Sequence, residues 1–482
     1  MSVDDILTIK LNSNDNVATA FNNIAKGEIT QNIKVENDIP KGHKIALKKI
    51  LKGEKIIKYD QIIGLARNDI NIGEHVHVEN TEFKSTEHDY EFSTSIRLPN
   101  FVPESQRPTF DGFKRPNGQV GTRNYIGILT SVNCSATAAR NIANAFDDNI
   151  LSQYPNVDGV VSFTHGTGCG MADSGDGFEA LQRVLLGYIQ HPNLAGVLLI
   201  GLGCEANQIK FLLDAYNLNE NPFFQTMTIQ EMGGLRKTIE EGIKRIHSML
   251  PEINQLKRSP QSVEHLSLAL QCGGSDAWSG ITSNPALGHA ADLLVKNGGT
   301  AVLAETPEIY GAEHLLTRRA INKTVGDKLV DRILWWEDYV SRNKGSLNNN
   351  PSPGNKAGGL TTILEKSLGA AAKGGTTPLN DVLLYAEKAK SKGFLFMDSP
   401  GYDPASVTGQ IATGCNLVSF TTGRGSAFGS KPSPSIKIAT NTEMYEHMKE
   451  DMDVNAGKVV TNNESIETVG SEIFDLLVRV AS

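Results

Sequence analysis

Blocks of consecutive apolar residues alternate with helix-length amphipathic segments along most of this chain. The apolar blocks are typical of strands buried on both faces of a parallel sheet, and they cover residues 125–129, 159–163, 196–200, 266–270, 300–304 and 393–397. Segments with a helical spacing of apolar residues separate them, at residues 136–146, 177–189, 208–216, 235–249, 285–296 and 328–342. This order predicts an α/β fold built on a doubly wound, mostly parallel sheet.

The first 80 residues follow a different pattern, with short β-type runs between turns such as Pro40-Lys41-Gly42. We expect a small, mostly β domain at residues 1–80. Residues 81–110 become polar and contain Pro99, Pro103 and Pro108, which predicts a linker over the surface. Residues 111–482 then form the α/β catalytic region, either as one domain or as two subdomains that divide near residue 255.

Composition and charge exclude several classes of protein. The 482 residues carry 46 basic and 54 acidic side chains with no long basic run, which excludes an electrostatic nucleic-acid binder. The chain opens without the basic start and apolar run of a signal peptide, and no stretch approaches the ~18 apolar residues of a membrane span. We therefore expect a cytoplasmic protein with no nucleic-acid or membrane partner. No Gly-x-Gly-x-x-Gly sequence lies between a predicted strand and helix, which argues against a nucleotide cofactor.

Four of the five cysteines follow directly after a predicted strand: Cys134, Cys169, Cys204 and Cys272. If these strands were parallel neighbours in one sheet, all four thiols would meet at its carboxyl edge, where such sheets bind ligands. Glycines and His165 lie close to them in sequence, which favours a metal site over a disulfide framework. The simpler alternative is that each cysteine fills buried space at a strand end.

Histidines are concentrated in the N-terminal domain, at His43, His75 and His77. In a strand His75 and His77 would point to the same face, because side chains alternate with a period of two. They are candidates for metal binding or proton transfer, and the alternative is an exposed pair on a solvated edge. Gly-rich segments further along carry candidate substrate-binding residues, namely Ser275, Asp276, Asn355, Lys356 and Arg424.

Several of these segments together resemble the altronate/galactarate dehydratase family, which also includes sulfolactate sulfo-lyases. The resemblance spans nearly the whole chain. Its residues are Phe113 to Asn124, Ser131 to Cys134, His165 to Gly170, Gly201 to Glu205, Cys272 to Asp276 with Ser279 to Pro285, Asn350 to Gly359, and Thr422 to Gly425. The first 80 residues resemble the small SAF-type β domain of this family.

The resemblance implies a hydro-lyase of carbohydrate and hexuronate catabolism that removes water from a six-carbon sugar acid, an altronate-type aldonate, and gives a 2-keto-3-deoxy acid. It implies a divalent metal, most simply Fe²⁺, with Mn²⁺ or an Fe–S cluster as alternatives. We expect Cys134, Cys169, Cys204, Cys272 and His165 as metal ligands. His43, His75, His77 and His165 are the expected catalytic residues, and the five Gly-rich-segment residues would bind the substrate. We also expect a homo-oligomer, a dimer.

Three alternatives stay open on the sequence. Galactarate dehydration or sulfolactate-type sulfo-lyase activity would use the same scaffold. A thiol or Fe–S redox protein would use the cysteines for electron transfer, and a non-catalytic sugar-acid binder would use the N-terminal domain.

Overall fold

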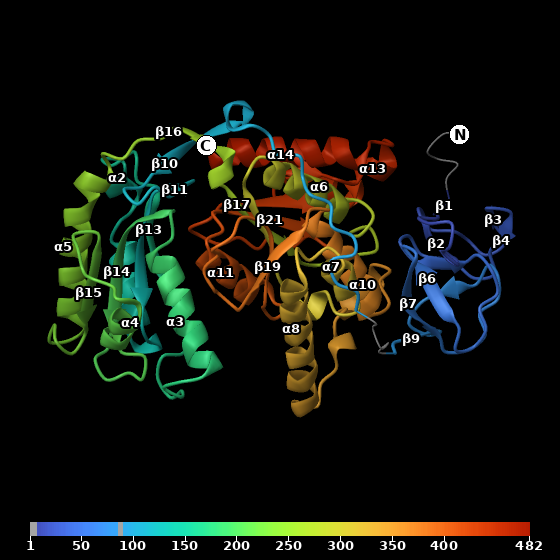
Figure 1. Cartoon of the computed structure of the whole chain (residues 1–482), viewed down its shortest axis with the longest axis horizontal. Coiled ribbons are helices and arrows are strands. Elements are labelled where there is room, and N and C mark those ends of the chain that lie inside the picture. The colour runs from blue at the N-terminus through green and yellow to red at the C-terminus, as the bar shows by residue number, and fades with distance from the viewer. Residues whose placement is uncertain (1–6, 85–89) are drawn as a thin grey trace.

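The computed structural model describes residues 7–84 and 90–482, which form three parts along the long axis of Figure 1. The N-terminal module (residues 7–84) and the middle part (residues 125–253) lie at opposite ends, and the C-terminal part (residues 263–482) lies between them. The chain from Tyr90 to Pro108 crosses the C-terminal part. Along this path Ser93 N donates to Thr317 O and Val102 N donates to Lys296 O, both at 2.9–3.1 Å.

The N-terminal module consists of short antiparallel strands, as the sequence predicts. Its sheets have the orders β1-β2-β5-β8, β3-β4 and β6-β7-β9. The strands are β1 (Thr8–Ile9), β2 (Val17–Ala20), β3 (Ile29–Thr30), β4 (Ile33–Lys34), β5 (Lys44–Ala46), β6 (Lys55–Lys58), β7 (Gln61–Ala66), β8 (His75–Val76) and β9 (Thr81–Glu82). Gly73 allows one tight turn, because its φ is +83° and a Cβ there would lie 2.1 Å from Lys34 O. The turn leads directly into β8.

The middle part is a four-stranded parallel sheet of order β13-β12-β14-β15 with helices on both faces. Its strands are β12 (Tyr125–Thr130), β13 (Gly159–Phe163), β14 (Leu194–Gly201) and β15 (Phe224–Thr228). Its helices are α1 (Ala136–Asn144), α2 (Asp148–Leu151), α3 (Asp176–Ile189), α4 (Ile209–Tyr216) and α5 (Leu235–Ile253). The predicted strand at 159–163 is confirmed residue for residue, whereas β15 was not predicted.

The C-terminal part is a seven-stranded parallel sheet of order β19-β20-β18-β17-β21-β22-β23. Its strands are β17 (Ser267–Cys272), β18 (Thr300–Leu303), β19 (Leu379–Leu383), β20 (Gly393–Met397), β21 (Leu417–Thr422), β22 (Ser435–Ala439) and β23 (Val454–Asn455). Its α-helices are α6 (Ser283–Lys296), α7 (Glu313–Thr317), α8 (Lys323–Arg342), α9 (Pro353–Ala357), α10 (Ile363–Ala371), α11 (Asp403–Thr413), α12 (Thr442–His447), α13 (Lys458–Thr461) and α14 (Ile466–Ala481).

Alternate residues of β17 face two different cores, which makes this sheet doubly wound. Leu268 and Leu270 pack with α6 and α14, and Ala269 packs with α11. The second core is continuous with the middle part, since α3 packs on α11. Gly187 permits that contact, because a Cβ there would lie 2.2 Å from Ala412 O.

A small antiparallel sheet of order β11-β10-β16 joins the middle and C-terminal parts. It consists of β10 (Thr109–Lys114), β11 (Val120–Gly121) and β16 (Ser259–Ser262). The fold class predicted from the sequence is therefore confirmed, a small β domain followed by parallel α/β structure. The expectation that all the cysteine-bearing strands share one sheet is wrong, because the strands divide between two sheets. No helix among residues 7–84 and 90–482 has the length and apolarity to span a membrane.

Candidate active site

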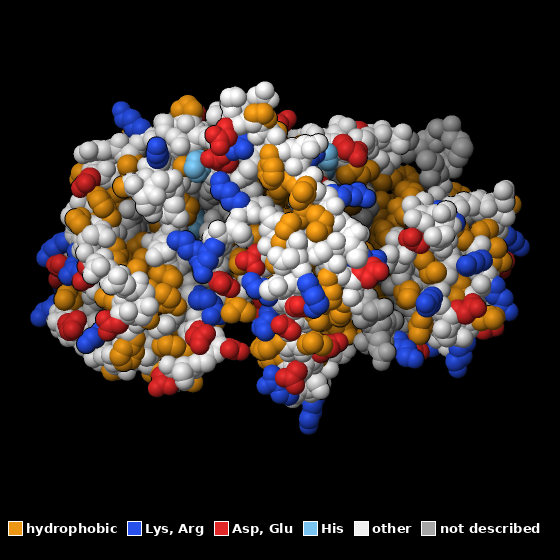
Figure 2. Space-filling view, viewed as in Figure 1, with side chains coloured by type: hydrophobic (Ala, Val, Ile, Leu, Met, Phe, Trp, Pro, Cys, Tyr) orange, Lys and Arg blue, Asp and Glu red, His pale blue; other side chains and the backbone are white. Residues whose placement is uncertain are grey.

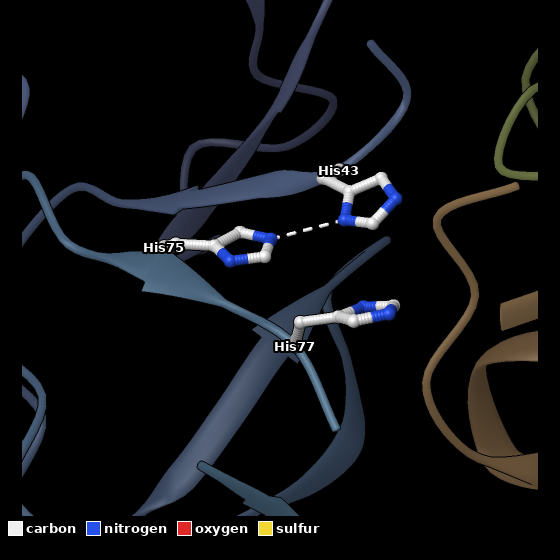
Figure 3. Close-up of side chains that lie close together, drawn as sticks. All are labelled: His43, His75 and His77. Atoms are coloured by element: carbon white, nitrogen blue, oxygen red, sulfur yellow. Dashed lines mark hydrogen bonds between the residues drawn. The ribbon is translucent and has the colours of Figure 1, made fainter. Parts of the chain in front are cut away.

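Three imidazoles of the N-terminal module converge on the side that faces the C-terminal part (Figure 3). His43 precedes β5, His75 opens β8 and His77 follows it, and β5 pairs with β8 so that Ile45 lies opposite His75. His43 Nδ1 lies 3.0 Å from His75 Nε2, and the ring centroids of His43 and His77 are 4.3 Å apart. The structure thus brings together three of the four histidines that the sequence proposed as catalytic.

The surroundings of all three imidazoles disfavour the protonated, charged form. Burial lowers the pKa of His43, and burial together with the neighbouring His43 lowers the pKa of His75 to about 4. Burial and the charge of Lys44 lower the pKa of His77 to about 3, and the buried His77 Nδ1 has no hydrogen-bond partner among residues 7–84 and 90–482. The three offer one ligand atom each within 4.8 Å of one another. Neutral imidazoles at this spacing are suited to a divalent transition metal.

A loop of the C-terminal part closes over this histidine triad. His43 Nε2 lies 3.3 Å from the carbonyl oxygen of Ala357, at the end of α9. Lys44, the next residue, is fully buried and donates to Gly359 O at 2.7 Å. Gly42 and Gly359 allow the close approach, since a Cβ on Gly359 would lie 2.3 Å from Gly42 O. The triad therefore lies at a packed seam between the two parts, as expected for a module that folds over the catalytic region.

A second cluster of ionisable side chains is buried at the carboxyl ends of β17 and β18. Cys272, Glu305 and Glu308 place ligand atoms within 4.8 Å of one another. Two lysines from the segment of α10 neutralise them: Lys366 Nζ lies 2.8 Å from Glu308 Oε1, and Lys373 Nζ lies 2.8 Å from Cys272 Sγ. The two ammonium groups offset negative charge on the carboxyl groups of the cluster.

Glu305 carries the clearest sign of strain in this cluster. It is 1% exposed, its φ is +73°, and neither carboxyl oxygen has a hydrogen-bond partner among the described residues; Lys373 Nζ is 3.9 Å away. Burial and the neighbouring Glu308 raise the pKa of Glu305 well above its usual value. Lys366 and Lys373 overcome the opposing effect of burial and lower the pKa of Glu308. Two carboxyl groups with oppositely shifted pKa values are the pattern of an acid and base pair.

The loop before α10 connects the cluster with the histidine triad. Asn350 Nδ2 donates to Glu308 Oε1, and Lys366 Nζ donates to Asn350 Oδ1, at 2.7 and 2.8 Å. A few residues later the same loop contacts His43. On α10 the neighbours Glu365 and Lys366 point to the N-terminal module and to the cluster respectively.

The structure does not gather the five proposed metal ligands. Cys134, Cys169 and Cys204 are exposed in the middle part, whereas Cys272 is buried in the other sheet. Burial raises the pKa of the Cys272 thiol to about 11. His165 stays in the middle part with both nitrogens engaged: Nε2 lies 2.8 Å from Thr130 O, and Nδ1 accepts from Thr167 N at 3.3 Å. Burial lowers its pKa.

Three of the proposed substrate-binding residues, Ser275, Asp276 and Asn355, form hydrogen bonds within the protein. Asp276 is 4% exposed, and its carboxylate accepts from Trp278 N, Ser279 N and Oγ, Thr440 Oγ1 and Asn441 Nδ2. Burial nevertheless raises its pKa. Asn355 forms a capping box with Ser352 and donates to the carbonyl oxygen of Ser275 at 2.7 Å. These contacts hold the loop against the triad.

Lys356 and Arg424 keep solvent-accessible charges. Lys356 immediately precedes Ala357, whose carbonyl oxygen contacts His43, and its side chain is partly buried. Arg424 is exposed, and a Cβ on Gly274 would lie 3.1 Å from Arg424 Cβ. Acidic and basic side chains are otherwise interspersed over the face shown in Figure 2.

The sequence did not reveal Glu305, Glu308, Lys366 or Lys373. No motif surrounds them, and the first two lie within a predicted strand end and turn. One sequence signal was present. An acidic and a basic residue are adjacent in an otherwise apolar helix segment, Ile363-Leu364-Glu365-Lys366.

Comparison with known proteins accounts for nearly the whole chain. Three family models match in succession: the altronate/galactarate dehydratase SAF domain (residues 6–84), the second domain of D-galactarate dehydratase/altronate hydrolase (residues 112–254) and the D-galactarate/altronate dehydratase C-terminal domain (residues 263–482). The altronate dehydratase of Bacillus subtilis (strain 168) is 39% identical over 485 residues, which cover 98% of this chain and 95% of that protein. The chain belongs to the altronate/galactarate dehydratase family.

Two further members of the family align almost as completely. The altronate dehydratase of Escherichia coli (strain K12) is 36% identical over 98% of this chain and 95% of its own length. The galactarate dehydratase (L-threo-forming) of the same organism is 35% identical over 98% of this chain and 92% of its own length. The N-terminal module is the SAF domain of the family. Membership identifies the chain as a hydro-lyase.

Proposed function

We propose that this enzyme removes water from a six-carbon sugar acid of the altronate type, and that His43, His75 and His77 bind the divalent metal that the reaction uses. The observation that carries the proposal is the convergence of three neutral imidazoles on a seam closed by the loop around Ala357. Galactarate is the alternative substrate, because both kinds of relative align with the chain to a similar extent.

The chemistry explains the need for such a site. Loss of water from a 2,3-dihydroxy acid requires removal of the proton beside a carboxylate, which builds up negative charge. A divalent metal, with Fe²⁺ as our proposed ion, would offset that charge when bound at the triad. The lowered pKa values of the three histidines favour neutral imidazoles, each of which leaves one ring nitrogen unprotonated and able to bind a metal. Lys356 supplies a positive charge next to the seam for the substrate carboxylate.

Proton transfer is assigned to the buried cluster. Glu305, whose raised pKa favours the protonated carboxyl group, would donate that proton to the departing hydroxyl group. Glu308 stays ionised between Lys366 and Asn350 and would accept the C2 proton as the base of the pair. The loop from Asn350 to Ala357 contacts this pair through Asn350 and the triad through Ala357.

Substrate comparison tests the proposed function. Full-length protein, purified without oxygen and supplied with Fe²⁺, is expected to release a keto acid from D-altronate and to release it more slowly from galactarate. Release from galactarate alone would move the assignment to that substrate. Sulfite release from sulfolactate, with no turnover of either sugar acid, would overturn the dehydratase.

The two proposed roles separate in a second assay. Glu305→Gln is expected to abolish turnover while metal binding at the triad persists. His77→Ala is expected to lose both turnover and metal binding at the triad. A Glu305→Gln enzyme with normal turnover would remove the proton-transfer assignment and leave the metal assignment standing.

A further inference from the structure

Three cysteines lie at the carboxyl edge of the middle-part sheet, outside the site described above. Cys134, Cys169 and Cys204 follow β12, β13 and β14, which are adjacent parallel strands in the order β13-β12-β14. All three thiols are exposed, in contrast to Cys272 and Cys415, which are buried. Neighbouring parallel strands end side by side, so the three loops that carry the cysteines start from the same edge.

The three loops are bonded to one another beside the cysteines. Asn133 N, adjacent to Cys134, donates to Thr167 O at 2.9 Å. Asn207 N, three residues after Cys204, donates to Gly168 O at 3.0 Å, and its side chain donates to Ser131 O at 3.1 Å. The cysteine loops therefore form one packed unit.

Glycines make this unit possible. Gly168, immediately before Cys169, has a φ of +98°, and a Cβ there would lie 2.3 Å from Ser131 O. Gly170 and Gly203 flank Cys169 and Cys204 with φ values of +66° and +123°. A Cβ on Gly170 would meet nothing within 4 Å. Gly203 N donates to Glu205 Oε2 at 2.6 Å, which fixes the loop before Cys204.

The spacing of the sulfur atoms argues against a single metal ion. One tetrahedral ion with metal–sulfur bonds of about 2.3 Å holds its thiolates roughly 3.8 Å apart. In the part of the chain that the structure describes, two groups of residues bring three ligand atoms within 4.8 Å of one another, and the three cysteines are not one of them. A multi-iron cluster spreads its thiolate ligands over several iron atoms, and its anchors stand farther apart.

Neither of the other two residues that the sequence proposed as metal ligands, Cys272 and His165, joins the three cysteines as a fourth ligand. Cys272 lies in the other sheet and its sulfur accepts from Lys373. His165 uses both ring nitrogens, Nε2 with Thr130 O at the end of β12 and Nδ1 with Thr167 N of its own loop. Three thiolates anchor three irons and leave the fourth to a small oxygen ligand such as water.

We propose that Cys134, Cys169 and Cys204 anchor a [4Fe–4S] cluster at the exposed edge of the middle part, separate from the divalent metal of the histidine triad. The site takes iron together with inorganic sulfide. This inference does not depend on which sugar acid the enzyme dehydrates.

Reconstitution of the full chain tests this site. Protein incubated without oxygen with Fe²⁺, sulfide and a thiol reductant is expected to bind about four irons and about four acid-labile sulfides at the cysteines. A broad visible absorption band and an electron paramagnetic resonance signal after reduction should accompany them. Binding of iron without labile sulfide would overturn the proposal, as would the absence of any visible band.

Serine variants locate the cluster. Cys134→Ser, Cys169→Ser and Cys204→Ser are each expected to lose most of the labile sulfide and the band, while Cys272→Ser, the matched control, keeps both. His77→Ala is expected to keep the sulfide, which separates the cluster from the triad. Circular dichroism verifies that each variant is folded. If Cys272→Ser loses the band as completely as Cys134→Ser, or the three variants keep it, the site is wrong.

Discussion

Lys44 of the N-terminal module and Glu365 of α10 form a fully buried ion pair across the seam. Their Nζ and Oε2 atoms are 2.9 Å apart, and both side chains are 0% exposed. Lys58 approaches the other carboxylate oxygen at 2.9 Å. The two lysines overcome the effect of burial and lower the pKa of Glu365. Since His43 immediately precedes Lys44, this pair fixes the position of the histidine triad against the C-terminal part.

Removal of Glu365 should therefore separate the two parts. Glu365→Ala leaves Lys44 and Lys58 buried without a counter-charge, and the expected loss is about 3–5 kcal/mol in the free energy of unfolding. Urea unfolding followed by tryptophan fluorescence measures it, because Trp278 contacts Phe21 across the seam. Glu443→Gln is the matched control, since its pair with Lys41 also joins the two parts but is exposed. Its expected cost is at most ~1 kcal/mol, and equal costs would contradict the account.

Glu305 should be dispensable for stability and necessary for turnover. Gln has the shape of the protonated carboxyl group that the raised pKa favours. Glu305→Gln is therefore expected to unfold at the wild-type temperature or above it at pH 7.5. Its turnover should fall by roughly 10²–10⁴-fold, because an amide cannot donate the proton. A variant that unfolds earlier but turns over normally would assign Glu305 a purely structural role.

The raised pKa of Asp403 predicts that this residue contributes to the free energy of unfolding in a pH-dependent way. Burial, followed by the charge of Glu308, raises its pKa from 3.8 to about 6. The folded state thus binds this proton more tightly than the unfolded state, so the stabilising contribution is complete below about pH 4 and is lost as the pH rises through 6. Asp403→Asn removes this loss. The stability of the variant relative to the wild type should increase between pH 4 and pH 7.5, as measured by urea unfolding, whereas a difference that is constant with pH would refute the assignment.

Lys356 should act on substrate affinity rather than on metal binding. A lost charge-assisted contact of about 1.5–3 kcal/mol predicts that Lys356→Ala raises the KM for the sugar acid by roughly 10–100-fold. Metal binding at the triad should be unchanged. Lys237→Ala, in α5 of the middle part, serves as the control. An unchanged KM would exclude Lys356 from the substrate site.

Regular patterns in the sequence predicted the fold well, and contacts between distant residues explain what was missed. The predicted strands at 159–163 and 393–397 match β13 and β20 in extent, because each is a short, mostly apolar block between polar turns. The histidines were recognised because they cluster in sequence. In contrast, parallel strands give no sequence signal for which sheet they join, so Cys272 was grouped with cysteines that belong to another sheet.

The buried cluster was missed for a related reason. Glu305 and Lys366 are 61 positions apart, and each looks like a surface charge until the fold encloses it. Asp276 was assigned to the substrate on its Gly-rich surroundings, which the structure explains by close packing: a Cβ on Gly423 would lie 2.2 Å from its carboxyl carbon. The glycines there allow the backbone to pack tightly against Asp276 and do not form an open binding loop.

The dependence of keto-acid release from D-altronate on added Fe²⁺, compared between the wild type and His77→Ala, tests the central claim most directly. We predict that the wild-type rate rises with Fe²⁺ to saturation, and that His77→Ala shows no Fe²⁺-dependent rate or requires at least 100 times as much, on the order expected when a metal ligand is removed. A His77→Ala enzyme with the wild-type rate and the wild-type half-saturating Fe²⁺ concentration would contradict the assignment of the histidine triad as the metal site.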